Sequence, residues 1–169
     1  MGVVLALQLA ALLGGGRAAG TGRGPAAPAG AVVYRPPVEG PLQVRRGFDD
    51  VGRYDAGHRG VDLAAGAGGA VVAAGAGVVT FAGTVAGRGV VVVLHADGIR
   101  TSYEPVAPAV AAGVVVTAGQ PLGVVSGAHG AFAPGAVLHW GARRGEVYLD
   151  PLQLLAPLGP VRLLPWADP

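Results

Sequence analysis

Glycine and proline interrupt this chain at short intervals, and this spacing limits its possible folds more than any other feature. The 169 residues include 31 Gly and 14 Pro, and the apolar runs between them are short and rich in Val. Gly and Pro destabilise helix interiors, whereas β-branched residues favour extended backbone. The pattern therefore predicts short strands joined by turns, in an all-β fold built as a compact antiparallel β sandwich or barrel with long loops.

Several segments carry the strand pattern clearly. Ala96-Asp97-Gly98 marks the strongest hairpin corner, because Asp-Gly favours a tight turn between paired strands. Two edge strands are expected at 32–34 and 42–44, on either side of a Pro-Pro pair. The six other expected strands are 70–73, 77–82, 89–95, 99–103, 121–125 and 137–143.

The start of the chain differs in character from the rest. Residues 3–13 form an apolar run of secretory-leader length, too short to span a bilayer, and small-residue cleavage sites follow at 27–29 and 29–31. No Arg or Lys precedes the run, so the alternative is a Gly/Ala/Pro segment behind a misassigned start codon. We expect an exported protein (extracellular, cell wall or periplasm) with no integral membrane span. The expected divisions are a signal peptide at 1–31, one domain at 32–155 and a Pro-containing tail at 156–169.

The missing residue types exclude several functions. Without Cys the chain has no disulfide, no thiolate zinc site and no cysteine nucleophile. All 12 basic residues are Arg, so Schiff-base and phosphate-loop lysines are excluded. The lack of Lys also excludes a lipoyl-type carrier, which the Gly-punctuated turns of 106–123 would otherwise suggest. Charged residues make up only 13% of the chain and form no basic stripe, so we expect no nucleic-acid partner.

The remaining chemistry lies in a few metal-binding residue types. His58 and Asp62 are four residues apart, which places them on one side of the chain, and neighbouring glycines favour an extended segment. Such a pair alone is more often simply solvated. His139 lies in an otherwise apolar strand, where a buried imidazole needs a partner, either a metal or a backbone carbonyl. Two imidazoles and a carboxylate form a normal three-ligand set for catalytic zinc.

These motifs resemble those of the lysostaphin-type (LytM-domain) zinc metallopeptidases, which cleave peptide cross-links in bacterial cell walls. His58-x-x-x-Asp62 is similar to the family's first motif, and 73–79 to its Ala-x-x-x-Gly-x-Val segment. The strand around His139, with Asp150-Pro151 beyond it, is similar to the family's closing His-x-His strand. The resemblance runs from about 44 to 155. It implies one Zn²⁺ held by His58, Asp62 and His139, with peptidoglycan stem or cross-bridge peptides as partners.

Two positions depart from the family's pattern, and both replace histidines that are not ligands. The family's Tyr-x-His corresponds to Tyr103-Glu104-Pro105, and the first His of its His-x-His corresponds to Val137. Glu104 and the loop residue His129 are therefore candidate replacements for the catalytic base. The alternatives are that Glu104 is a solvated turn carboxylate and that His129 faces solvent. Strand alternation points Glu104 opposite to Tyr103, so we expect it to reach the metal only if Pro105 turns the chain. Tyr103 is a candidate hydrogen-bond donor to substrate or an ordinary packing residue.

Two functions follow from this mixture. The complete ligand set favours a zinc-dependent endopeptidase of peptidoglycan, weakly active if its base is rearranged. The replaced histidines favour a catalytically degenerate relative that binds peptidoglycan or activates another cell-wall hydrolase. The arginine pairs at 45–46 and 143–144 are expected to serve solubility, with contact to the anionic wall polymer as the alternative.

Overall fold

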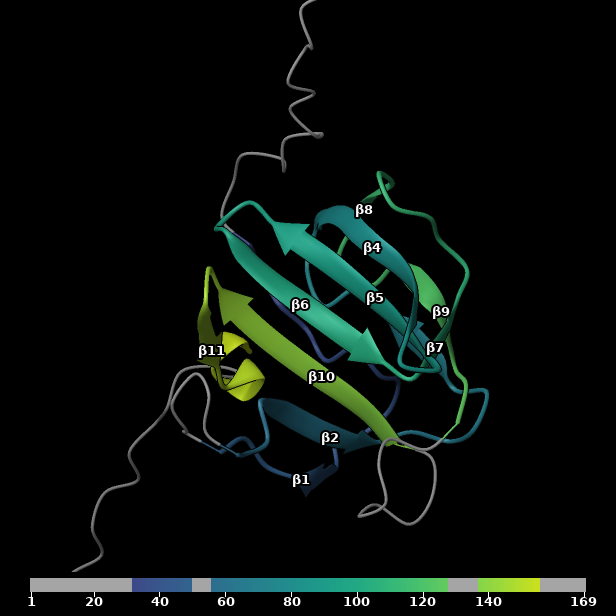
Figure 1. Ribbon diagram of the computed structural model, residues 1–169, viewed down its shortest axis with the longest axis vertical. Helices are drawn as coiled ribbons and strands as arrows, with labels where there is room; N and C mark the ends of the chain where they lie inside the picture. The colour runs from purple at the N-terminus through teal and green to yellow at the C-terminus, as the bar shows by residue number, and fades with distance from the viewer. Residues whose placement is uncertain (1–31, 50–55, 128–136, 156–169) are drawn as a thin grey trace, which may run out of the picture.

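The computed structural model describes residues 32–49, 56–127 and 137–155, which form two antiparallel sheets (Figure 1). Among these residues no helix is long and apolar enough to cross a bilayer. The larger sheet, in spatial order, contains β1 (Val44–Arg46), β2 (Gly60–Ala64), β10 (Val137–Arg144), β6 (Ile99–Glu104), β5 (Arg88–His95), β4 (Gly77–Val85) and β8 (Val115–Val116), and β11 (Val147–Leu149) pairs with β10. The smaller sheet contains β3 (Ala70–Val72), β9 (Pro121–Val125) and β7 (Val106–Pro108), and a 3₁₀ helix, η1, spans Pro151–Leu154.

This architecture confirms the predicted all-β antiparallel fold. The described residues form a pair of sheets and not a closed barrel. All six clearly patterned strands form, and the Asp97-Gly98 corner joins β5 to β6 with Gly98 at a φ of +82°. The expected edge strand at 42–44 is shifted to β1, and 32–34 contributes only a bridge from Tyr34 to Leu155. The predicted leader 1–31 and tail 156–169 lie outside the described residues.

The core lies between the two sheets and is built mainly from Val and Leu side chains of both. Its two largest members, Trp140 of β10 and Tyr103 of β6, are fully buried and lie directly opposite each other in the strand register. Because side chains alternate along a strand, the next pair, His139 and Glu104, must lie on the other face of the sheet. Packing of these two aromatic residues into the core therefore decides which residues lie on the opposite face of the larger sheet, called the open face below.

A buried series of polar groups crosses this core. The Ala74 N–H donates to the Tyr103 hydroxyl at 2.9 Å, and the Tyr103 and Thr101 hydroxyls are 2.8 Å apart. Thr101 Oγ1 lies 2.8 Å from His95 Nε2, and His95 Nδ1 lies 2.9 Å from the Ala76 carbonyl. A carbonyl only accepts, so Nδ1 carries the proton, and in the neutral ring Nε2 accepts from Thr101. Every hydrogen bond in the series then points from Ala74 toward Ala76.

This series predicts a loss of stability in acid. Burial lowers the pKa of His95 below its ordinary value of 6.5, against smaller opposing effects of the Ala76 carbonyl and Asp97. Between the two pKa values the unfolded state binds more protons than the folded state, so the free energy of unfolding falls as pH falls below about 6.5. Denaturant unfolding of metal-free protein should show this dependence from pH 7.5 to 5. The slope should be smaller in His95→Gln, and equal slopes in the two proteins would contradict this account.

Candidate metal centre

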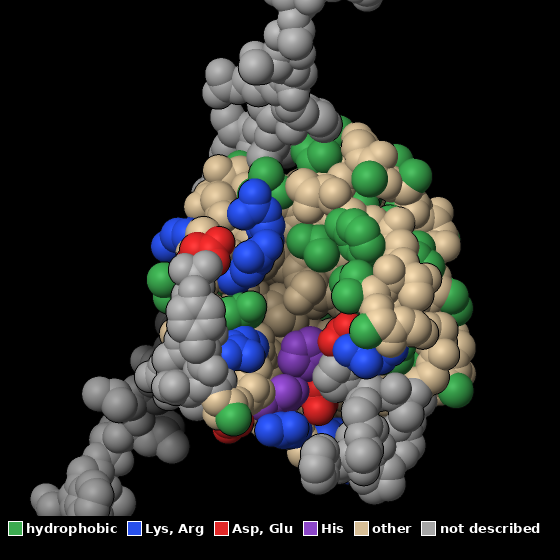
Figure 2. Space-filling model, viewed as in Figure 1, with side chains coloured by type: hydrophobic (Ala, Val, Ile, Leu, Met, Phe, Trp, Pro, Cys, Tyr) green, Lys and Arg blue, Asp and Glu red, His purple; other side chains and the backbone are tan. Residues whose placement is uncertain are grey.

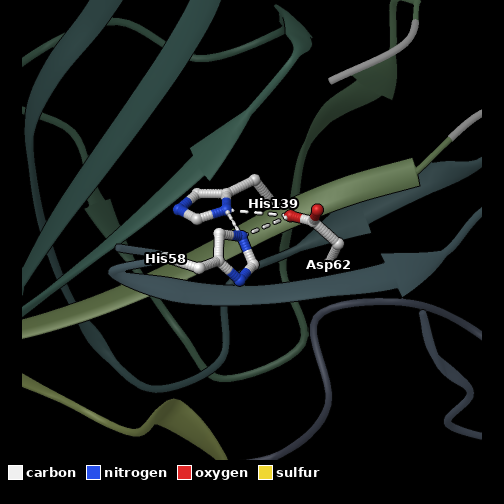
Figure 3. Close-up of side chains that lie close together, drawn as sticks. All are labelled: His58, Asp62 and His139. Carbon is white, nitrogen blue, oxygen red and sulfur yellow. Dashed lines mark hydrogen bonds and ion pairs between the residues drawn. The ribbon is translucent and has the colours of Figure 1, made fainter. Parts of the chain in front are cut away.

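Three potential ligand atoms converge on the open face of the larger sheet (Figure 3). His58 Nε2 lies 2.9 Å from Asp62 Oδ1 and 3.0 Å from His139 Nδ1, and His139 Nδ1 lies 2.9 Å from the same Asp62 oxygen. Asp62 is in the middle of β2, and His139 lies directly opposite it on β10. His58 comes from the segment just before β2. Strand pairing thus unites residues that are 77 positions apart in the sequence.

The hydrogen bonds around His58 show what this cluster needs. His58 Nδ1 donates to the Gly47 carbonyl at 2.6 Å, because a carbonyl cannot donate. In the neutral ring the lone pair of Nε2 then faces the Asp62 carboxylate, which also only accepts. Asp49 fixes the segment further: it accepts from the His58 N–H at 2.8 Å, and its own N–H donates to the His58 carbonyl. Converging acceptors require a cation or a proton between them, and the imidazole–carboxylate set fits zinc.

Two glycines give the His139 ring its place. Gly60 of β2 pairs with Gly141 of β10, two positions from the pair formed by Asp62 and His139 and therefore on the same face of the sheet. A Cβ atom at Gly60 would lie 2.7 Å from His139 Cε1 and Nε2, closer than real side chains approach. One at Gly141 would lie 2.6 Å from Ser102 Oγ. The imidazole therefore lies over bare backbone, which only glycine provides.

Glu104 lies on the same face as the metal cluster. It is directly opposite His139 in the register between β6 and β10, and one of its oxygens lies 3.6 Å from Arg88 Nε. The expectation that Glu104 needs a turn at Pro105 to lie on the side of the metal cluster is wrong. Tyr103 occupies the core face, so alternation alone directs Glu104 to the open face. The residue is half-buried rather than a solvated turn carboxylate.

The other predicted residues are placed differently. Tyr103 is fully buried, its hydroxyl lies in the hydrogen-bond series of the core, and burial raises its pKa to about 12. A substrate contact by Tyr103 is therefore contradicted, and the residue packs in the core. Val137 begins β10 on the face of His139 and is 2% exposed, while Pro105 is buried just beyond β6. His129 lies outside the described residues.

Sequence reasoning missed a basic pocket beside the metal cluster. Arg59, Arg100 and Arg143 line it together with Ser102 and Tyr148, and its volume is about 140 Å³. Figure 2 shows the histidines in a hollow on this face, with basic side chains on several sides and a group of apolar side chains above and to the right. The signal that could have found it is the period of two in β6 and β10, which places two arginines on the histidine's face.

Comparisons with known proteins agree with this arrangement. Residues 56–151, which include all three potential ligands, match the sequence model of peptidase family M23. The uncharacterized protein Rv2891 of Mycobacterium tuberculosis is 45% identical over 134 residues, which are 76% of this chain and 53% of that protein. The chain thus spans about half the length of the curated relatives it matches.

Two solved structures share the fold. The solution structure of lysostaphin matches with a TM-score of 0.51 and 26% identity, over 62% of this chain and 44% of that one. A chain from the crystal structure of the SpoIIIAH and SpoIIQ complex matches with a TM-score of 0.62 and 26% identity, over 72% of this chain and 99% of that one. These likenesses confirm the lysostaphin-type resemblance predicted from the motifs.

Proposed function

Because the chain belongs to peptidase family M23, we propose that it is a zinc-dependent endopeptidase that cleaves peptides of the bacterial cell wall. The observation that carries the proposal is the convergence of His58 Nε2, Asp62 Oδ1 and His139 Nδ1 within 3.0 Å of one another. Zinc is the proposed metal because two imidazoles and one carboxylate commonly hold a catalytic zinc and leave a coordination position open.

The residues around the cluster suit peptide hydrolysis. When bound, zinc supplies Lewis acidity that activates a water and polarises the scissile carbonyl. Asp62 balances part of the positive charge, the Gly47 carbonyl holds the His58 ring in the tautomer that ligation needs, and Asp49 fixes the His58 backbone. Glu104 presents a carboxylate on the same face, opposite His139, and is our proposed proton acceptor. Arg88 restrains that carboxylate from the neighbouring strand.

The proposed substrates are peptidoglycan stem or cross-bridge peptides. The motifs shared with the lysostaphin-type peptidases support this choice, and so does the open face on which the ligands lie, because a long polymer can approach it. Such a substrate lies outside the cytoplasmic membrane. The proposal therefore includes export, for which the apolar run at 3–13 is the sequence support.

A second candidate is a degenerate domain that binds peptidoglycan or activates another wall hydrolase. Pro105 and Val137 favour it, because the resemblance places non-ligand histidines of active relatives at these positions. Loss of a base and of an oxyanion donor each lowers rates by about 10²-fold or more without removing a ligand. The likeness to a chain of the SpoIIIAH and SpoIIQ complex further supports a role in binding a partner protein.

Purified peptidoglycan separates these candidates. Zinc-loaded protein should release new amino termini from it, and His139→Ala, which lacks a ligand, should release none. Zinc content and circular dichroism of both proteins show whether the variant has lost metal alone or its fold as well. Co-sedimentation with peptidoglycan, without release of amino termini by the wild-type protein, would overturn the peptidase and support the binding domain.

A further inference from the structure

The basic pocket beside the metal cluster is built from four strands, β5, β6, β10 and β11, and the segment before β2. Arg100 of β6 lies directly opposite Arg143 of β10, and Tyr148 of β11 lies opposite Arg143 on its other side. The guanidinium of Arg59 stacks on the Tyr148 ring, 5.3 Å from its centroid. Three cationic side chains thus line one opening of about 140 Å³, with the Ser102 hydroxyl beside them.

The paired arginines of this pocket repel each other when no anion lies between them. Like charges directly opposite each other on paired strands destabilise a sheet. Both Arg100 and Arg143 are half-buried, which limits the solvent available to screen them. In the described parts of the chain no carboxylate forms an ion pair with either guanidinium. The pocket therefore has the charge, the donors and the space for a small anionic group.

We propose that this pocket binds a carboxylate of the peptide substrate, several residues from the cleaved bond. Arginine suits a carboxylate because its planar group donates two parallel hydrogen bonds to the two oxygens. The volume admits a carboxylate and a few waters, since one water occupies about 30 Å³ in the liquid. The assignment rests on the proposed function, because it takes the ligand to be a peptide that also reaches the metal cluster.

The strand register gives the spacing between the two sites. Arg143 is four residues from His139 on β10, which is about 13 Å at 3.3 Å per residue. Only Gly141 stands between them on this face, so no side chain of β10 blocks the path. An extended peptide lying along β10 covers this distance with about four residues. The pocket therefore selects peptides with an acidic side chain or a free terminal carboxylate at that distance from the cleaved bond.

Binding of matched synthetic peptides tests this assignment. Each peptide carries a carboxylate or the corresponding neutral amide, placed three to five residues on either side of a central bond. Their affinities are measured on the full chain stripped of metal, so that no peptide is consumed. We expect the carboxylate to tighten binding by about 10- to 100-fold, the worth of hydrogen bonds to a charged group. Arg143→Gln and Arg100→Gln should remove most of this preference.

The control is Arg144→Gln, which makes the same chemical change one residue away at an exposed position, paired with Ile99. It should keep the full preference. The assignment is overturned if the wild-type protein does not distinguish carboxylate from amide, or if Arg143→Gln and Arg144→Gln behave alike. It is also overturned if glycerol phosphate displaces the peptide at lower concentration than acetate, which would assign the pocket to a phosphate polymer. Cleavage is measured separately with zinc-loaded protein. Absence of cleavage would contradict the proposed peptidase function without changing the result of the binding experiment.

Discussion

Val137→His is expected to raise the rate of peptide cleavage by the zinc-loaded protein by about 10²- to 10³-fold, the usual worth of one donor to the developing oxyanion. Position 137 is two residues before His139 on β10, so alternation directs both side chains to the same face. The resemblance to lysostaphin-type peptidases places a histidine there, whereas Val137 has no hydrogen-bonding group. Steady-state cleavage of a peptide substrate, with zinc content measured in parallel, provides the test.

Val137→Leu is the matched control, because it changes the side chain at the same position without adding a donor. Its rate should equal that of the wild-type protein. A Val137→His protein that folds, keeps one zinc and cleaves no faster would show that this position does not limit catalysis. The binding domain would then become the better account of the chain.

Gly60→Ala is expected to weaken zinc binding by about 10- to 100-fold, the range found when groups that orient a ligand are altered. The added Cβ would lie 2.7 Å from the His139 ring and 2.6 Å from the Trp140 carbonyl. The backbone carbonyl cannot move without disturbing the pairing of β2 with β10, so the imidazole must leave its position over Gly60. Zinc affinity is measured by competition with a chromogenic chelator.

Gly66→Ala is the control for this substitution, because no heavy atom lies within 4 Å of a Cβ built at that position. It should bind zinc as the wild-type protein does. Thermal unfolding of the metal-free proteins separates loss of a ligand from loss of the fold. Unchanged zinc affinity in a folded Gly60→Ala protein would show that His139 does not ligate the metal through the ring position seen here.

The longer strands were predictable because their signal is local. Val-rich runs bounded by Gly or Pro specify β5 and β9 without reference to the rest of the chain. The short strands β7, β8 and β11 have two or three residues each, and their extended backbone depends on the partners they pair with. Sequence patterns carry little information about such segments.

The metal cluster was only partly predictable from the residues themselves. The spacing of His58 and Asp62 is visible in the sequence, but their approach to His139 depends on the pairing of β2 with β10. The ligand set of His58, Asp62 and His139 was inferred through family resemblance, and no local pattern indicated which strands pair. The side of the sheet occupied by Glu104 was misjudged because it depends on Tyr103 being a core residue. Hydrophobic patterning does not decide whether a tyrosine faces the core or the other side of the sheet, because its side chain is amphipathic.

The hydrogen-bond series from Ala74 to Ala76 has a consequence for the open face. It ties Thr101 and Tyr103 of β6 to the 74–76 segment and to His95 of β5. A slip of β6 by one residue would break these bonds together, and each buried polar group left without a partner costs about 1–3 kcal/mol. The same slip would turn Arg100, Ser102 and Glu104 inward. The buried series thus acts as a register lock that keeps the polar side of β6 turned toward the metal cluster.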